Sequence, residues 1–340
     1  MIVVLLYMAI VVIYIAQYEA WGVVRIGLYS PLASLFLLFF QLAVIWLYVY
    51  LTVRVFINGG ERPFQQAWEA LKNIVTLSRI VGLVLPVVII SIFNSIHTSF
   101  KATIGTIEPY HFDPLFAALD KSIHGGVAPW QITHGLISTT NGTLIIDLFY
   151  TGWFFVMWGF LFWQIFRLNH PMQRQQFLLS YVLCWSVIGT LFAHLLASAG
   201  PCYYGMVTDG SDLYAPLMER LHLMKLELLF HGDWRDLRAL NGQEYLRAGH
   251  LNAEVVSGGG ISAMPSMHVS MAMLFMLSAW QINKIFGWLM LAYLLVIIFG
   301  SVHLGWHYAV DGYVSVLLTI IIWLLSGQVV RVFHPAKYAN

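Results

Sequence analysis

The sequence predicts an all-α protein that crosses the membrane about eight times and carries amphipathic helices at the membrane interface. Hydrophobic residues make up 59% of the 340 residues and charged residues only 10%, and the mean hydropathy is +0.75. Such a chain has too few polar side chains to cover its surface in water. Several apolar runs approach the roughly 20 residues that cross a bilayer as a helix, which indicates an integral membrane protein.

Bulk properties also exclude other classes of protein. The two cysteines, Cys184 and Cys202, form neither a disulfide framework nor a metal-binding spacing. A formal net charge of +1 gives no reason to expect a nucleic-acid partner. The oligomeric state is not readable from these features.

The N-terminal part, 1–98, contains three predicted spans. The first lacks the basic start and the small-residue cleavage site of a signal peptide, which predicts a retained helix. Apolar residues recur at helical spacing among polar ones over 61–79, so this stretch is predicted to be an amphipathic surface helix. The three spans are expected at 2–16 (continued toward Trp21), 32–57 and 80–96.

The remainder of the chain contains five more predicted spans. Segment 99–140 is of mixed character and is predicted to form interfacial helices rather than a soluble domain. The predicted membrane core, 141–326, includes a long polar stretch at 200–262 for which interfacial helices are again expected, and 327–340 is a predicted cytoplasmic tail. The five spans are expected at 144–166, at 177–199, from Ser266, from Phe286 and at 308–325.

Basic residues predict the orientation in the membrane. With the N-terminus inside, most Lys and Arg residues of the short connections lie on the cytoplasmic side, and only Arg25, Lys101 and Lys121 oppose them. Both termini are therefore expected in the cytoplasm. The starts of spans six and eight and the end of span five then meet at the outer, periplasmic or lumenal, membrane face.

Two short motifs stand at the beginning of these C-terminal spans. Segment 264–268 reads Met-Pro-Ser-Met-His, and segment 300–311 carries His307 and Asp311 four residues apart. In a helix these two side chains share one face, so the carboxylate can hold the imidazole. Because both motifs reach the outer face, His268 is expected to approach the pair.

Two histidines and a carboxylate suit chemistry at a phosphorus centre. In this scheme His307 is the nucleophile, Asp311 orients it and His268 protonates the departing alkoxide. The start of span six, opened by Pro265 and Ser266, is expected to offer backbone N–H groups to a phosphate. The scheme requires no metal and no other cofactor.

These residues resemble a known family. The Pro-Ser-x-His and Gly-x-His-Tyr-x-x-Asp segments are similar to the second and third signatures of the type 2 phosphatidic acid phosphatase superfamily, loosely over 140–326. The resemblance implies a six-helix phosphatase-type membrane core. It also implies the same catalytic roles for His268, His307 and Asp311.

Two departures from the family pattern bear on the substrate. The family's first signature carries Lys and Arg ahead of a proline, and here the stretch around Pro201 has no cation; the third signature usually has an Arg where this chain has Ser301. A phosphate monoester carries about two negative charges and needs such cations more than a phosphodiester does. The basic residues of the polar stretch could instead complete the site: Arg220, Lys225, Arg235, Arg238 and Arg247.

The pattern without these cations is similar to the inositol phosphorylceramide synthase (aureobasidin-resistance) and sphingomyelin synthase branch. The stretches at 200–204 and 112–120 are similar to the same branch. This resemblance implies transfer of a phospho-alcohol headgroup from a phospholipid donor to a lipid hydroxyl acceptor, through a phospho-histidine. A lipid phosphate phosphatase is the first alternative. The second is a non-catalytic lipid-binding or transport protein.

Further residues are candidates for substrate binding. His303, one turn before His307, either lines the same pocket or has a structural role. Asp147 either contacts the headgroup or pairs with a neighbour. Asp113 and Asp120 are expected on a solvated helix face unless they bind headgroup hydroxyls. The candidate substrate-binding residues are Ser266, Ser301, His303, Pro201, Tyr203, Tyr204, Asp147 and Arg247.

Overall fold

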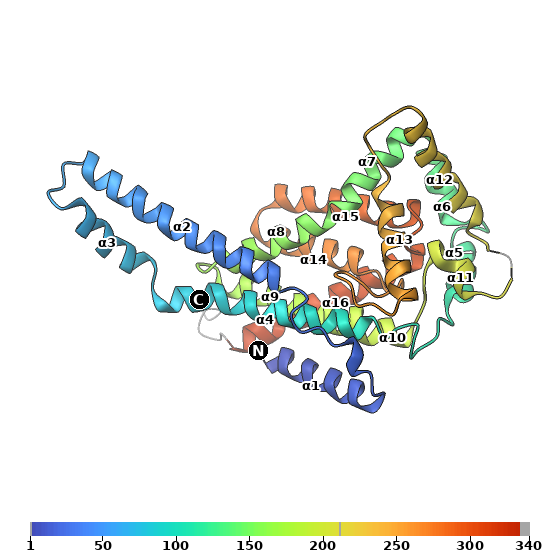
Figure 1. Ribbon diagram of the computed structural model, residues 1–340, viewed down its shortest axis with the longest axis horizontal. Coiled ribbons are helices and arrows are strands. Elements are labelled where there is room, and N and C mark those ends of the chain that lie inside the picture. The colour runs from blue at the N-terminus through green and yellow to red at the C-terminus, as the bar shows by residue number, and fades with distance from the viewer. Residues whose placement is uncertain (1, 211, 334–340) are drawn as a thin grey trace.

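The structure, a computed structural model, describes residues 2–210 and 212–333 and confirms the all-α membrane fold (Figure 1). Within those residues all named elements are helices and no strand is formed. Six helical segments are long and apolar enough to cross a membrane. Two shorter apolar helices, α1 (Ile2–Gln17) and α14 (Met267–Ile282), coincide with the two remaining predicted spans.

The N-terminal part includes an arm that projects from the rest of the molecule (Figure 1). The arm is formed by α2 packed on α3, and both α1 and α2 also contact α4. The predicted surface helix 61–79 is divided, because Thr76 caps a new helix by accepting a hydrogen bond from the Arg79 N–H. The elements are η1 (Trp21–Val23), α2 (Ser30–Ile57), α3 (Pro63–Ile74) and α4 (Leu77–Lys101).

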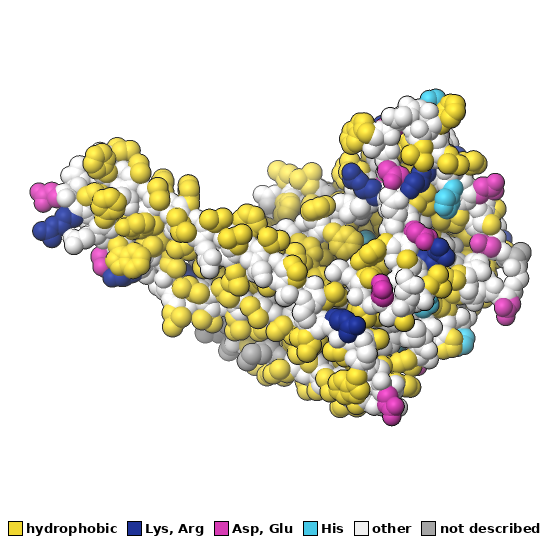
Figure 2. Space-filling view, viewed as in Figure 1, with side chains coloured by type: hydrophobic (Ala, Val, Ile, Leu, Met, Phe, Trp, Pro, Cys, Tyr) yellow, Lys and Arg dark blue, Asp and Glu magenta, His cyan; other side chains and the backbone are white. Residues whose placement is uncertain are grey.

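Apolar side chains cover the arm and the middle of the molecule, whereas charged side chains gather at the tip of the arm and at the opposite end (Figure 2). On α2, Phe39 and Trp46 are each 66% exposed and Phe56 is 72% exposed. Extended apolar surfaces of this kind are rare on soluble proteins, whereas in a bilayer the lipid covers them. The surface therefore agrees with a membrane location.

Short helices gather at the end of the molecule away from the arm, and we call α5, α6, α11, α12 and α13 the helical cap (Figure 1). The two segments predicted to form interfacial helices, 99–140 and 200–262, supply the cap. The cap elements are α5 (Asp113–Ile123), α6 (Pro129–Leu136), η3 (Pro201–Tyr203), α11 (Tyr204–Val207), α12 (Ala215–Phe230) and α13 (Arg238–Leu251).

The membrane core surrounds α14, which packs against α9, η2, α15 and α16. Most residues of α14 are buried, as expected for a helix that is apolar on nearly every side. The other core elements are α7 (Thr140–Thr151), α8 (Trp153–Phe166), α9 (Pro171–Leu183), the π-helix η2 (Cys184–Phe192), α10 (Ala193–Leu195), α15 (Lys284–His303) and α16 (Ala309–Phe333).

Two boundaries differ from the sequence-based prediction. Span four is divided at Gly152 between α7 and α8. The last helix, α16, continues to Phe333, so the predicted tail 327–340 begins as helix. Residues 334–340 lie outside the described residues.

Candidate active site

The two sequence motifs meet at the end of the membrane core that carries the helical cap. His268 lies in the first turn of α14, and His307 lies in the connection between α15 and α16. Their ring centroids are 6.2 Å apart. Asp311 lies in the first turn of α16. The structure therefore brings the three predicted catalytic residues together although 39 positions separate the two histidines.

A tight turn carries His307. The Ser301 carbonyl accepts hydrogen bonds from the backbone N–H groups of Trp306 and His307, both at 3.0 Å. Gly305 has φ +75°, a left-handed conformation that favours glycine. The turn reverses the chain after α15, so that His307 lines the same cavity as His268.

Asp311 holds the His307 imidazole. His307 Nδ1 lies 3.2 Å from Asp311 Oδ2, which also accepts a hydrogen bond from the Tyr308 N–H at 3.0 Å. A neutral imidazole that donates from Nδ1 carries its lone pair on Nε2. Burial lowers the pKa of His307, and the Lys101 ammonium contributes in the same direction. Both effects favour the neutral, nucleophilic form.

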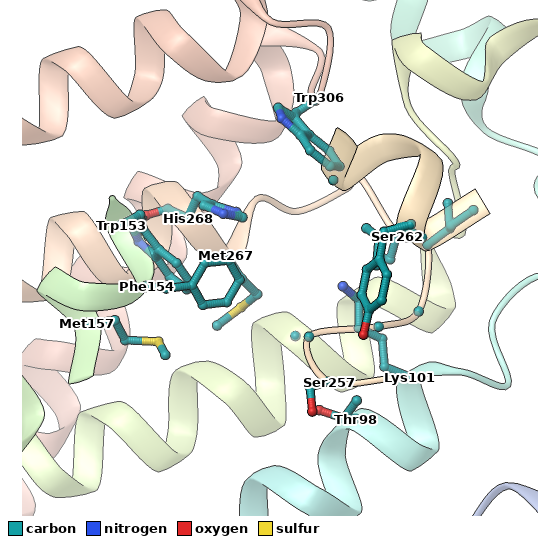
Figure 3. Close-up of a pocket in the computed structure, with 18 of the residues that line it drawn as sticks. Thr98, Lys101, Trp153, Phe154, Met157, Ser257, Ser262, Met267, His268 and Trp306 are labelled. Atoms are coloured by element: carbon teal, nitrogen blue, oxygen red, sulfur yellow. Dashed lines mark hydrogen bonds between the residues drawn. The ribbon is translucent and has the colours of Figure 1, made fainter. Parts of the chain in front are cut away.

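Aromatic rings hold His268 in place (Figure 3). The imidazole stacks on Tyr150 with the centroids 4.7 Å apart, and it packs on Trp153 at 4.2 Å. Trp153 also donates an indole N–H hydrogen bond to the His268 carbonyl at 3.1 Å. These contacts restrict rotation of the imidazole, which the predicted role of a general acid requires.

The carboxylates Asp113 and Asp120 do not lie on a solvated helix face. Both are buried, and Asp120 accepts hydrogen bonds from the N–H groups of Ala309 and Val310 at 2.8 and 3.0 Å. Asp120 thus caps the start of α16, one turn from His307. Burial raises the pKa of both carboxyl groups, and the backbone donors oppose that shift. The expectation of a solvated face is wrong because α5 packs against α16.

Asp113 fixes the end of span five against the same turn. Its carboxylate accepts from the N–H groups of Ala199 and Gly200 at 2.9 and 2.8 Å, and from the Tyr308 hydroxyl at 2.8 Å. Gly200 must be glycine, because its φ is +97° and a Cβ would lie 2.7 Å from the Trp306 carbonyl oxygen. The two aspartates position the loops of the site and do not line the cavity.

Asp147 pairs with a neighbouring helix rather than facing the cavity. It is buried and accepts hydrogen bonds from the N–H groups of Arg238 and Ala239 at 2.9 and 2.8 Å. Those N–H groups begin α13, whose free donors and positive dipole end favour a carboxylate. Asp147 therefore joins α7 to the cap.

Three other predicted substrate-binding residues have structural contacts behind the cavity. Ser266 is the N-cap of α14 and accepts from the Val269 N–H at 3.4 Å, with Pro265 before the cap. The Ser301 hydroxyl donates to the carbonyl of Ile298. His303 stacks on His134 and hydrogen-bonds Thr143, and like Ser266 and Ser301 it does not line the cavity.

The remaining candidates are also mostly outside the cavity. Tyr203 lines it and donates its hydroxyl proton to the Gln243 carbonyl at 2.8 Å. Pro201 and Tyr204 are buried beside it without lining it, and Arg247 is exposed and paired with Glu244. Of the five loop cations considered for the phosphate site, Arg238 lines the cavity, and the other four lie away from it: Arg220, Lys225, Arg235 and Arg247.

The site opens on a cavity of about 270 Å³. Aromatic side chains form one wall, including Trp153 and Phe154 beside His268 (Figure 3). The glycine-rich segment 257–262 and the end of α4 form the facing wall. Such a cavity, apolar with a few convergent polar groups, is typical of a site for a small molecule or a lipid headgroup.

The sequence motifs do not point to one charged residue of this cavity, Lys101. It ends α4, outside the predicted catalytic core, and Asn94, His97 and Thr98 precede it on the same cavity wall. These positions recur at helical spacing at the end of an otherwise apolar span. Polar residues in such a place indicate a functional face, and that signal is present in the sequence.

Comparison with protein families matches residues 115–325, more than half of the chain, to the PAP2 superfamily. The comparison with curated proteins finds no match, and neither does the comparison with solved structures. The matched region contains both histidine motifs and Asp311, and begins after α4. The chain therefore belongs to the PAP2 superfamily and is an integral membrane enzyme of the phosphatase or phosphotransferase kind.

Proposed function

We propose that the protein is a lipid phosphotransferase, which moves a phospho-alcohol headgroup from a phospholipid donor to the hydroxyl group of a lipid acceptor. The observation that carries the proposal is the pair of histidines lining one cavity, with Asp311 on Nδ1 of His307. This arrangement supplies a nucleophile, its orienting carboxylate and a second proton-transfer group. It supports the roles that the resemblance implies for the same three residues.

In the first step Nε2 of His307 attacks phosphorus, and the bond between phosphorus and the donor's lipid oxygen breaks. His268 gives its proton to that oxygen, and the donor leaves as a lipid alcohol. The headgroup phosphate remains on His307, and the Asp311 carboxylate stabilises the positive charge of the substituted imidazole. A bound phosphate favours the protonated form of His268 that this step requires.

In the second step the acceptor hydroxyl gives its proton to His268 and attacks phosphorus. The bond between phosphorus and Nε2 breaks, the headgroup passes to the acceptor, and His307 returns to its neutral state. Water in place of the acceptor would give hydrolysis, which is the phosphatase alternative. The aromatic wall beside His268 supports transfer, because it favours the apolar body of a lipid alcohol over water.

Product analysis tests the proposal. Purified protein is incubated with a phospholipid and a long-chain lipid alcohol, and the lipids are identified by mass spectrometry. We expect a new phospholipid built on the acceptor, and no such product with His268→Ala. Release of phosphate or phospho-alcohol without a new lipid would instead identify a phosphatase. Lipid binding without any turnover would indicate a non-catalytic protein.

We also propose that the site faces the outer, periplasmic or lumenal, side and that both termini are cytoplasmic. The distribution of basic residues supports this orientation, and the start of α1 and the end of α16 lie away from the helical cap (Figure 1). A cysteine at exposed Asp209, in the loop between α11 and α12 of the cap, should react with a membrane-impermeant maleimide in intact cells. Labelling only after the cells are opened would reverse the orientation.

A further inference from the structure

A lysine lies in the cavity with the two histidines, although no sequence motif marks it. Lys101 ends α4 and lies on the opposite side of the cavity from His268 (Figure 3). His268 and His307 line the same cavity. An ammonium in this place can act on a group that is held between the two imidazoles.

The Lys101 ammonium has no anionic partner in the described part of the chain. No hydrogen bond or ion pair joins its Nζ to residues 2–210 or 212–333, and none of their Asp or Glu side chains lines the cavity. A partly buried cation without a partner is unfavourable, whereas a charge-assisted hydrogen bond to an anion removes much of that cost. The cavity therefore suits an anionic ligand.

The glycine-rich segment 257–262 packs directly on the base of this lysine. A Cβ at Gly260 would lie 2.9 Å from the Lys101 carbonyl carbon and oxygen, and Gly260 has φ +84°, so only glycine permits this approach. The Tyr29 hydroxyl accepts a hydrogen bond from the Gly258 N–H at 3.0 Å and holds the segment in place. The backbone of Lys101 is therefore held in place at the cavity wall.

The other cation that lines the cavity occupies a different position. Arg238 is exposed, and its backbone N–H donates to Asp147, which does not line the cavity. Water at the margin of the site screens the Arg238 charge. Of the two Lys and Arg residues that line the cavity among the described residues, Lys101 is therefore the less exposed.

We propose that Lys101 binds the phosphate of the phospholipid substrate, in a chain whose motifs lack the family's usual cations. This inference rests on the proposed function and names the group that recognises the donor. One ammonium matches the single negative charge of a phosphodiester better than the roughly two charges of a monoester. Because Lys101 precedes the matched region 115–325, the family comparison does not include it.

Equilibrium binding to full-length protein tests this role separately from turnover. The reference protein is His307→Ala, which cannot form the covalent intermediate. The probes are tritiated dihexanoyl phosphatidylglycerol, whose phosphate is its one charge, and tritiated dihexanoylglycerol, which has no phosphate. Adding Lys101→Gln should weaken binding of the phospholipid about 10- to 100-fold and leave the diglyceride unchanged, because a hydrogen bond to a charged group is lost.

Two further variants keep the test decisive. Lys121→Gln removes an exposed lysine of α5 and should change neither affinity. Lys101→Arg keeps the charge and should retain most of the phospholipid affinity, even if the glutamine variant is poorly folded. Equal phospholipid affinity with and without Lys101→Gln would overturn the role of Lys101 and leave the proposed transferase untouched. Weaker binding of both probes with Lys101→Gln would overturn the proposal and show that Lys101 has only a structural role.

The outcome for the proposed function is read from a different measurement. If the wild-type protein transfers no headgroup, the transferase is wrong, yet a phosphate-specific loss with Lys101→Gln still establishes the binding site. If the reference protein binds the phospholipid no better than the diglyceride, it does not recognise the phosphate, and the Lys101 proposal is overturned whatever the enzyme's reaction.

Discussion

The hydrogen bond between His307 and Asp311 decides which imidazole nitrogen is free for the proposed attack on phosphorus. With Nδ1 donating to Oδ2 at 3.2 Å, the lone pair is on Nε2. The same carboxylate oxygen accepts the Tyr308 N–H, so its position is fixed by the backbone. At the scale of single residues, the proposed reactivity of His307 depends on this one hydrogen bond more than on the net charge of the site.

Replacement of Asp311 by asparagine should remove catalysis with little effect on substrate binding. The amide keeps the shape of the side chain but no longer fixes the imidazole tautomer or stabilises its positive charge. A comparable change in a serine protease lowers kcat about 10⁴-fold, and we expect a loss of about 10³- to 10⁴-fold here. The measurement is kcat together with the Kd for the phospholipid.

The matched control is Asp209→Asn, which removes an exposed carboxylate and should behave as the wild type. A kcat of Asp311→Asn within tenfold of this control would show that Asp311 does not orient the nucleophile.

The pH dependence of kcat/KM reports the free enzyme, and it should lack an acid limb near the ordinary histidine pKa of about 6.5. Burial lowers the pKa of His307, so the imidazole stays neutral as the pH falls from 7 to 5. We therefore expect kcat/KM not to decrease over this range. A sample held at pH 5 and assayed at pH 7 controls for denaturation, and a decrease with a midpoint near 6.5 would contradict the assignment.

At the residue scale the sequence predicts which three residues come together in the site and misses the residues that support them. Residue type and spacing are enough to select His268, His307 and Asp311, because the chemistry at phosphorus restricts which side chains can serve. Lys101 belongs to no sequence motif of this kind. Its position in the cavity depends on how α4 packs against the rest of the molecule. Predicted substrate-binding residues such as Ser301 and His303 belong to the same motif segment but do not line the cavity.

At the scale of elements, the beginning of α16 is the part of the site that depends most on distant contacts. Its first N–H groups, those of Ala309 and Val310, are free donors at a helix start, and Asp120 of α5 accepts both. Because α16 carries Asp311, this contact fixes a proposed catalytic residue through its backbone. Asp120 is therefore a positioning residue, although it does not reach the cavity.

Asparagine at position 120 should weaken this cap. The two carboxylate oxygens of Asp120 accept one backbone N–H each. In asparagine only one oxygen can accept such a hydrogen bond, and the amide N–H₂ would face the other backbone N–H. We expect a loss of about 1.5–3 kcal/mol of stability, the usual contribution of a hydrogen bond to a charged group, and a lower kcat. Thermal unfolding in detergent and lipid turnover measure the two effects.

A lower kcat with an unchanged KM for Asp120→Asn would support positioning of the reacting groups. The same unfolding midpoint and kcat as Asp209→Asn would instead show that Asp120 has no role in holding α16.

Local sequence predicts where helices form, but it does not predict which residues of different helices contact each other. The amphipathic helix at Pro63–Ile74 is visible in helical spacing, whereas the start of a new helix after Thr76 was not predicted. The contact of Asp120 with Val310 joins residues 190 positions apart. No local pattern distinguishes such a buried cap from a solvated acidic face, which is why the solvated face was the wrong expectation.

At the scale of the whole molecule, the matched PAP2 region and the N-terminal helices share one cavity. The region 115–325 supplies the histidines, and α4 supplies the facing wall with Lys101. Composition and hydropathy predict the membrane fold, and the order of the spans predicts that three helix ends converge. They do not predict which side of α4 faces the site, because that depends on packing among α4, α8 and η2.

The central claim is that His307 carries the headgroup phosphate during turnover, and trapping that intermediate tests it most directly. The protein is mixed with a phospholipid in the absence of an acceptor lipid and quenched in alkali, in which phospho-histidine survives. Peptide mass spectrometry should find the phospho-alcohol group on His307 and no adduct in His307→Ala. An active protein whose adduct lies on another residue, or that turns over lipid after His307→Ala, would contradict the account.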